Sequence, residues 1–258
     1  MPNAKDVTIN TEWLKVMSVG ESGEGKSIFA ASFPTPGFLF DFGREVLSYK
    51  QKDFEYEQFD LNPQGWGKFE KVFLDVKKEV NEGKYQTLVV DNLGAMTDLA
   101  MEKAMQLDPK RSSTGGPLWN VHYQMVKNLM EGRLRQFLNL NCNLVMIAHL
   151  EVIKDEDGAV IGVEPGLTGK LSADVPAYFD EVYYHTHRKE GGGDTKWFIQ
   201  TVPIGRNHGR SRLSGKERVL PDLVENDYNE IIAYLTGKKK KQVTTNKQSI
   251  NKKETKNG

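Results

Sequence analysis

The sequence contains little cysteine and no long apolar run. Cys142 is its only cysteine, so an internal disulfide is excluded and a reducing compartment is the natural one. No stretch approaches the roughly 20 apolar residues that a membrane helix needs, and the opening MPNAKDVTINTEW lacks the apolar core of a signal peptide. We therefore expect a soluble, cytoplasmic protein with no membrane partner.

The chain also lacks an overall charge, since 35 lysines and arginines balance 35 aspartates and glutamates. Residues 238–258 nevertheless hold eight lysines and one glutamate, a net of +7, which leaves residues 1–237 at −7. With Val243 and Ile250 as its only large apolar residues, this stretch predicts a disordered tail after one folded domain, 1–237. The tail could hold nucleic acid or an acidic partner by charge, or serve only as a solubilising end. The acidic remainder argues against a broad DNA-binding face on an isolated subunit.

Glycine is concentrated in one place. GESGEGKS follows an apolar segment, Trp13–Val19, and matches the spacing G-x-x-x-x-G-K-[ST] of a phosphate-binding loop. In such a loop backbone N–H groups face the phosphates, Lys26 reaches the β- and γ-phosphates, and the Ser27 hydroxyl ligates Mg²⁺. The alternative is a flexible glycine turn. The predicted nucleotide-binding residues are Gly20, Glu21, Ser22, Gly23, Glu24, Gly25, Lys26, Ser27 and Ile28.

The rest of the chain alternates between apolar strand patterns and helical patterns. Strands are predicted near 13–20, 37–42, 85–92 and 143–150, and helices near 26–33, 66–80, 95–105 and 118–139. This order predicts an α/β fold with a mostly parallel sheet and helices on both faces. Two later hairpins, around Asp157-Gly158 and around EGGG, predict antiparallel strands added at the C-terminal edge. Residues 43–65 show no clear pattern.

Polar residues at the strand ends are candidates for catalysis. Asp91 follows the apolar run of TLVVDN and would orient Mg²⁺ through water, or else cap the following helix. The base that activates water is either Asp41, at the tip of GFLFDF, or Glu45. His149, at the end of the fourth strand, could sense the γ-phosphate or be purely structural.

The ordered set GESGEGKS, FLFDFGRE, TLVVDN, LVMIAHLE, FDEVYY and IGRNHGRS resembles the RecA-like ATPase core over residues 12–236. More narrowly, it is similar to compact phage-encoded RecA-like ATP-binding proteins. These are labelled AAA-type ATPases, and some are single-strand annealing recombinases of the Sak type. The resemblance implies a RecA-like P-loop NTPase core that uses ATP and Mg²⁺ in the cytoplasm of a bacterial host.

The resemblance also assigns roles to individual residues. The superfamily usually has a glutamate two residues after the second strand's aspartate, where this chain has Gly43, so Glu45 replaces it or hydrolysis is slow. His149 matches the polar sensor at the strand tip. GRNHGR resembles a motif that sends an arginine into a neighbouring subunit's site, with Arg206 as the finger and Arg210 behind it, or else it is a charged loop.

The family's DNA-facing loops follow the third and fourth strands. Here these loops carry Lys110 and Arg111, and then Lys154 and Lys170. Four acids within 155–164 oppose DNA, and neither loop contains an aromatic residue for base stacking.

Three functions are consistent with these observations. The first is a Mg²⁺-dependent ATPase of phage DNA recombination, replication or repair that binds single-stranded DNA as a homo-oligomer. Its partners would include single-strand-binding protein or other replication and recombination proteins. The second is a nucleotide-controlled protein-binding switch with slow or incidental hydrolysis. The third is a motor or loader subunit of the helicase type.

Overall fold

The computed structural model describes residues 12–189, 193–214 and 218–240. Its main sheet has the order β12-β8-β7-β1-β5-β4-β2-β3, with β6 and β11 paired off this path and β9 pairing β10 separately. The strands are β1 Lys15–Gly20, β2 Gly37–Asp41, β3 Phe54–Gln58, β4 Thr87–Asp91, β5 Asn143–Lys154, β6 Val160–Pro165, β7 Glu181–Lys189, β8 Thr195–Gln200, β9 Pro203–Ile204, β10 Asn207–His208, β11 Arg210–Ser211 and β12 Leu223–Glu225. The helices are α1 Lys26–Ala30, η2 Val46–Tyr49, α2 Gly65–Asn81, α3 Leu93–Leu107, α4 Trp119–Leu138, α5 Leu171–Asp174, η3 Val175–Tyr178 and α6 Tyr228–Leu235.

The centre of the sheet is parallel and one edge is antiparallel. Strands β3, β2, β4, β5, β1 and β7 run in one direction, while β8, β12 and β11 run against their neighbours. Register pairs Gly20 with His149, and pairs Asp91 with both Asp41 and Ile147. The polar strand ends singled out above therefore lie at one edge of the sheet. The predicted arrangement, mostly parallel with antiparallel strands added by the C-terminal part, is confirmed.

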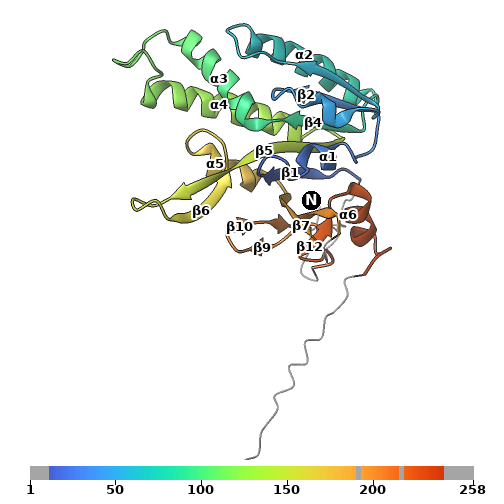
Figure 1. Ribbon diagram of the computed structural model, residues 1–258. Helices are drawn as coiled ribbons and strands as arrows, with labels where there is room; N and C mark the ends of the chain where they lie inside the picture. Colours follow the sequence, from blue (N-terminus) through green and yellow to red (C-terminus); the bar gives the residue numbers. More distant parts are fainter. Residues whose placement is uncertain (1–11, 190–192, 215–217, 241–258) are drawn as a thin grey trace, which may run out of the picture.

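Alternation along the strands explains the three layers (Figure 1). On β2, Phe38 and Phe40 belong to the core beneath α2, α3 and α4, whereas Leu39 belongs to the core shared by α1, η2 and α6. Each central strand is buried on both faces, because helices cover both sides. The first core is rich in rings: Phe40 lies 5.2 Å from Phe137, and Phe137 lies 4.5 Å from Phe73. This packing holds the strand ends that form the site.

Strand β3 lies in the stretch that showed no clear pattern. It is the edge strand beside β2, and its residues are partly or fully exposed. A strand with only one neighbour and little burial has no continuous apolar run to reveal it.

Two segments project beyond the carboxyl edge. Strand β5 has 12 residues, and its last five, beyond His149, are partly or fully exposed and pair with β6 as a hairpin (Figure 1). The loop between α3 and α4, residues 108–118, projects on the same side in Figure 1.

The end of the described chain follows α6. The backbone N–H of Lys239 donates to the carbonyl of Ala233 at 2.8 Å. Most of the predicted lysine-rich tail, residues 241–258, lies outside the described residues. Within the described ranges, no helix is long and apolar enough to span a membrane.

Candidate nucleotide-binding site

The phosphate loop connects β1 to α1 and depends on glycine at two positions. Gly23 and Gly25 both have φ of 83°, in the left-handed region that side chains rarely adopt. A Cβ on Gly25 would also lie 2.8 Å from Nδ2 of Asn226 and 3.2 Å from Cδ1 of Trp197. Gly25 is therefore required both by its backbone conformation and by the close approach of two side chains.

Three side chains meet at the base of this loop. The Ser27 hydroxyl donates to Oδ2 of Asp91 at 2.8 Å, and the Tyr49 hydroxyl donates to the same oxygen at 3.3 Å. Lys26 Nζ donates to the carbonyl of Glu21 at 2.6 Å, so the lysine folds back over its own loop. Asp91 is 2% exposed and Lys26 is 6% exposed. The loop and the tip of β4 are thus joined into one polar site.

Burial controls the ionisation of this site. Desolvation, together with nearby Glu45 and Asp41, raises the pKa of Asp91 to about 6, against the opposing hydrogen bonds from Ser27 and Tyr49. Desolvation also lowers the pKa of Lys26, against the attraction of Asp91 and Glu45. The carboxylate is therefore held in a place where its own charge is costly, and a cation placed beside it would relieve that cost.

The donor set fits Mg²⁺. Ser27 and Asp91 offer hard oxygen ligands, which Mg²⁺ prefers. No group of three or more His, Cys, Asp or Glu side chains that could hold a metal occurs in the described part of the chain. An ion held by Ser27 and Asp91 would need water and phosphate oxygens to complete its coordination, as Mg²⁺ bound with a nucleotide does.

Glu45 and His149 line the same cavity as the loop, and Asp41 does not. This phosphate cavity, about 230 Å³, is lined by Lys26, Ser27, Glu45, Asp91 and His149, among others. Asp41 is fully buried; one of its oxygens accepts from the N–H of Glu45 and the other from Nε2 of Gln58, both at 2.8 Å. Of the two predicted bases, Glu45 faces the cavity and Asp41 positions the segment that carries Glu45.

Gly43 is packed against the site. Its N–H donates to the carbonyl of Asp91 at 2.9 Å, and a Cβ there would lie 2.9 Å from Nδ2 of Asn92. Asn92, rather than Asp91, caps α3, because its Oδ1 accepts from the N–H of Ala95 at 2.9 Å. The alternative role of Asp91 as the helix cap is therefore filled by Asn92, and the Asp91 side chain instead accepts the hydrogen bond from Ser27.

His149 lies on β5 beside Gly20, the last residue of β1, and is exposed on the cavity side of the sheet edge. Its Nε2 lies 3.4 Å from Nδ2 of Asn92, and burial of the ring, with Lys26 nearby, lowers its pKa. A neutral imidazole here can exchange one hydrogen bond with a group that enters the cavity.

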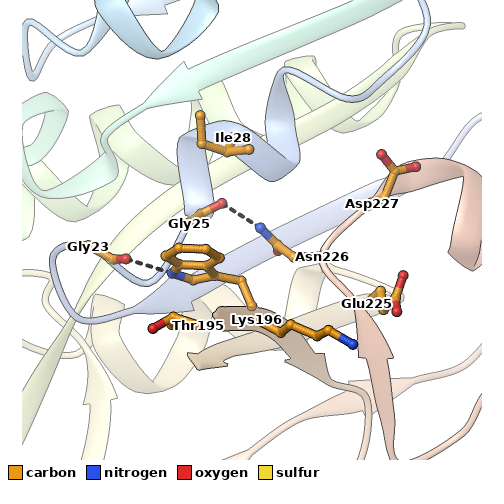
Figure 2. A pocket seen from close by; sticks show the side chains of 9 residues that line it. Gly23, Gly25, Ile28, Thr195, Lys196, Glu225, Asn226 and Asp227 are labelled. Carbon is orange, nitrogen blue, oxygen red and sulfur yellow. Dashed lines mark hydrogen bonds between the residues drawn. The ribbon is translucent and has the colours of Figure 1, made fainter. Parts of the chain in front are cut away.

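Sequence reasoning missed the residues that hold the loop from behind. Nε1 of Trp197 donates to the Gly23 carbonyl at 3.1 Å, and Nδ2 of Asn226 donates to the Gly25 carbonyl at 2.9 Å (Figure 2). His187 pairs with Glu24 at 2.9 Å. These partners lie on or directly after β7, β8 and β12, more than 160 positions along the chain. No local motif could indicate them.

The two arginines of GRNHGR have different surroundings. Arg206 is exposed at the turn between β9 and β10, and it is not among the described residues that line the phosphate cavity. Arg210 instead donates through Nη2 to the carbonyls of Pro176 and Phe179, at 2.5 and 2.8 Å. Arg210 ties β11 to η3, so its guanidinium is committed within its own chain.

The four predicted DNA-binding residues are all exposed, and Lys170 lies directly before α5. Lys154 ends β5, while Lys110 and Arg111 lie in the loop after α3. Arg111 is occupied, since its guanidinium donates to the carbonyls of Met105, Asp108 and Lys110. An aromatic residue that the loops themselves lack is close by: Trp119, 68% exposed, lines a cavity together with Lys170.

Comparisons with known proteins identify the family of this chain. A search of curated proteins gave no match. Among 164 matching chains of solved structures is the flagellar accessory protein FlaH from Methanocaldococcus jannaschii. It is 9% identical, the alignment covers 82% of this chain and 83% of that chain, and the TM-score is 0.39. The family model described as the AAA domain matches residues 12–213. With its phosphate loop, Lys26 and strand-tip Asp91 arranged as a P-loop site, the chain belongs to the AAA domain family.

Proposed function

We propose that this chain is a RecA-like ATPase that binds ATP with Mg²⁺ and hydrolyses it in phage DNA recombination, replication or repair. In this role it binds single-stranded DNA as a homo-oligomer in the bacterial cytoplasm. The observation that carries the ATPase proposal is the 2.8 Å hydrogen bond from Ser27 to Asp91. It joins the start of α1 to the tip of β4, where a metal bound with the nucleotide would need both oxygens.

Each residue of the site has a task in this reaction. Backbone N–H groups of the loop bind the phosphates, and Lys26 exchanges the Glu21 carbonyl for a γ-phosphate oxygen. Ser27 and Asp91 would hold Mg²⁺, which would supply positive charge beside the phosphates. Glu45 accepts the proton of the attacking water, and His149 donates to a γ-phosphate oxygen and responds to its loss.

Exposed groups outside the cavity support DNA binding and assembly. Trp119 packs against Tyr123 with ring centroids 4.4 Å apart, so an exposed indole is held beside Lys170. Bases stack on such surfaces while lysines attract the backbone. Arg206, exposed at its turn, is free to enter a neighbouring subunit's cavity.

A second function, a nucleotide-controlled switch that docks a protein partner, is favoured by Gly43. Gly43 leaves no carboxylate at the position where the superfamily usually has one, and a side chain there would press on Asn92. In that case single-strand-binding protein or another replication or recombination protein would dock on the loops that ATP orders, and turnover would be incidental.

Steady-state ATP hydrolysis, measured with and without single-stranded DNA over a range of protein concentration, tests the proposal. We expect turnover per subunit to rise with protein concentration and with DNA, and to vanish in Lys26→Ala. Slow ATP hydrolysis that single-stranded DNA does not stimulate, together with ATP-dependent binding of purified single-strand-binding protein, would favour the nucleotide-controlled switch. Strand displacement would identify a helicase-type motor. Full activity in Lys26→Ala would overturn the nucleotide site itself.

A further inference from the structure

A second and larger cavity adjoins the phosphate cavity. Its volume is about 510 Å³, against about 230 Å³ for the phosphate cavity, and both are lined by Gly23, Gly25 and Ile28. Figure 2 shows these loop residues above strand residues Thr195 and Lys196, with Glu225, Asn226 and Asp227 beside them. A ligand whose phosphates lie on the loop can therefore extend directly into this space.

The wall of this cavity is apolar, exposed and fixed. Ile28 is 57% exposed and Trp197 is 42% exposed, although both are large apolar side chains. Trp197 is held by its hydrogen bond to Gly23 and by its packing against Gly25. A rigid indole opposite an aliphatic side chain is a good surface for a flat heteroaromatic ring.

Both cavities are lined by one lysine and two acidic residues, so their polar groups differ in placement and not in number. In the phosphate cavity, Ser27 lies against Asp91 as the pair that would hold Mg²⁺. In the larger cavity, Glu225 and Asp227 lie beside the apolar wall, and carboxylates can accept hydrogen bonds from the amino and ring N–H groups of bases. The larger cavity therefore suits the base end of a nucleotide.

We propose that this cavity, here called the base pocket, takes the purine base and ribose of the nucleotide, with the base against Trp197 and Ile28. The inference rests on the proposed function and deepens it, because it assigns nucleotide selection to residues 195–197 and 225–227. It also couples the base to the loop. Trp197 and Asn226 hold the carbonyls of Gly23 and Gly25, so a base that packs on Trp197 steadies the loop that grips the phosphates.

Calorimetric binding with Mg²⁺ tests the base pocket by comparing ATP, UTP and inorganic tripolyphosphate, which has no base. We expect ATP to bind at least about ten-fold more tightly than tripolyphosphate, a difference of about 1.4 kcal/mol, with UTP between them. Ile28→Ala should weaken ATP binding about three- to ten-fold and tripolyphosphate binding by less, because Ile28 lines both cavities but only ATP places a base against it. Thr195→Tyr, which places a larger side chain in the base pocket, should likewise weaken ATP binding more than tripolyphosphate binding.

The matched control is Leu74→Ala on α2, since Leu74 is 58% exposed and Ile28 is 57% exposed. It should bind all three ligands as the wild type does. Equal affinity for ATP and tripolyphosphate, or equal weakening of both by Ile28→Ala, would overturn the base pocket while leaving the phosphate site intact. Binding of neither ligand would overturn the proposed function together with the inference.

Discussion

The phosphate loop and the β5–β6 hairpin both follow parallel strands at the same edge of the sheet, yet they are held in different ways. In the loop, the carbonyls of Gly23 and Gly25 and the side chains of Glu24, Lys26 and Ser27 each have a bonded partner. The hairpin is held by the backbone pairing of β5 with β6 and by its own turn. In that turn, Asp155 Oδ1 accepts from the N–H groups of Asp157 and Ala159. The loop is fixed by distant parts of the chain, while the hairpin depends on its own residues.

This difference fits the contacts proposed for each region. Phosphoryl transfer requires donors and charges fixed in place before the substrate arrives. A polymer or a protein partner is better met by exposed segments that adapt to it. The proposed arginine finger connects an exposed turn with a fixed cavity, because Arg206 lies between β9 and β10 and would act in the phosphate cavity of a neighbouring subunit.

The largest expected effect tests that connection. Arg206→Ala should lower turnover by about 10³-fold and leave ATP affinity nearly unchanged, because the finger stabilises charge on the transferring phosphoryl group. Mixing Arg206→Ala with Lys26→Ala subunits should restore partial activity, since mixed interfaces pair an intact loop with an intact arginine. The measurement is ATP hydrolysis against mixing ratio.

Arg210→Ala is the matched control for Arg206. Arg210 holds the carbonyls of Pro176 and Phe179, so its loss should lower the thermal midpoint, and mixing with Lys26→Ala should rescue nothing. If assembled mixtures of Arg206→Ala and Lys26→Ala stay inactive, Arg206 acts only within its own chain.

The next effect distinguishes the two carboxylates of the β2 end. Glu45→Gln should reduce kcat about 10²-fold with little change in stability, because it removes a base that lines the phosphate cavity. Asp41→Asn should instead cost about 1–3 kcal/mol of unfolding free energy, because its buried oxygens accept from Glu45 and Gln58. Steady-state kinetics and urea denaturation of both variants separate the roles. Unchanged turnover in Glu45→Gln would remove Glu45 as the base.

Asp91 gives a pH-dependent effect of intermediate size. Its pKa is about 6 in the folded chain, against an ordinary value of 3.8, so the folded state retains a proton that the unfolded state has lost between these pH values. The free energy of unfolding should therefore fall as pH rises from about 4 to 6, by up to about 3 kcal/mol. Asp91→Asn should remove this slope and also abolish Mg²⁺-dependent hydrolysis.

Urea denaturation without nucleotide or Mg²⁺, at several values between pH 4 and 7, measures this slope. The comparison is the difference between wild type and Asp91→Asn, because Glu181, whose pKa burial also raises, contributes equally to both. Parallel pH profiles would show that Asp91 ionises as freely as an exposed carboxylate.

Local patterns predicted the parts of the site that lie on continuous segments. The loop, its flanking strand and Asp91 were predictable because a buried strand is a short apolar run and the glycines of the loop are required by its backbone. The same logic missed β3, whose exposed edge position leaves no such run.

Contacts between distant segments were beyond these patterns. The partners of Gly23 and Gly25 lie 174 and 201 positions away, and nothing in β8 or β12 marks Trp197 or Asn226 as part of a phosphate site. The resemblance named Arg206 as the finger with Arg210 behind it. The sequence did not reveal that Arg210 is occupied, because the carbonyls that bind it belong to η3 and its end. The roles of Arg206 and of the DNA-facing lysines stay predictions.

The smallest effect concerns the lysine-rich tail. The cut belongs after Lys240, because Lys239 pairs with Glu230 and its N–H bonds to Ala233. Residues 241–258 carry five lysines and one glutamate, a net of +4. Their deletion should leave the thermal midpoint and ATP hydrolysis without DNA unchanged. Affinity for single-stranded DNA at low salt should fall several-fold and its salt dependence should weaken, because fewer phosphates are neutralised.

Exchanging the five lysines of residues 241–258 for glutamine in the full chain is the matched control, and it should reproduce the effect of the deletion. Titration of labelled single-stranded DNA at several salt concentrations measures both. Identical curves for all three proteins would assign the tail to solubility alone, and DNA binding would then depend on Trp119, Lys170 and the loops around them.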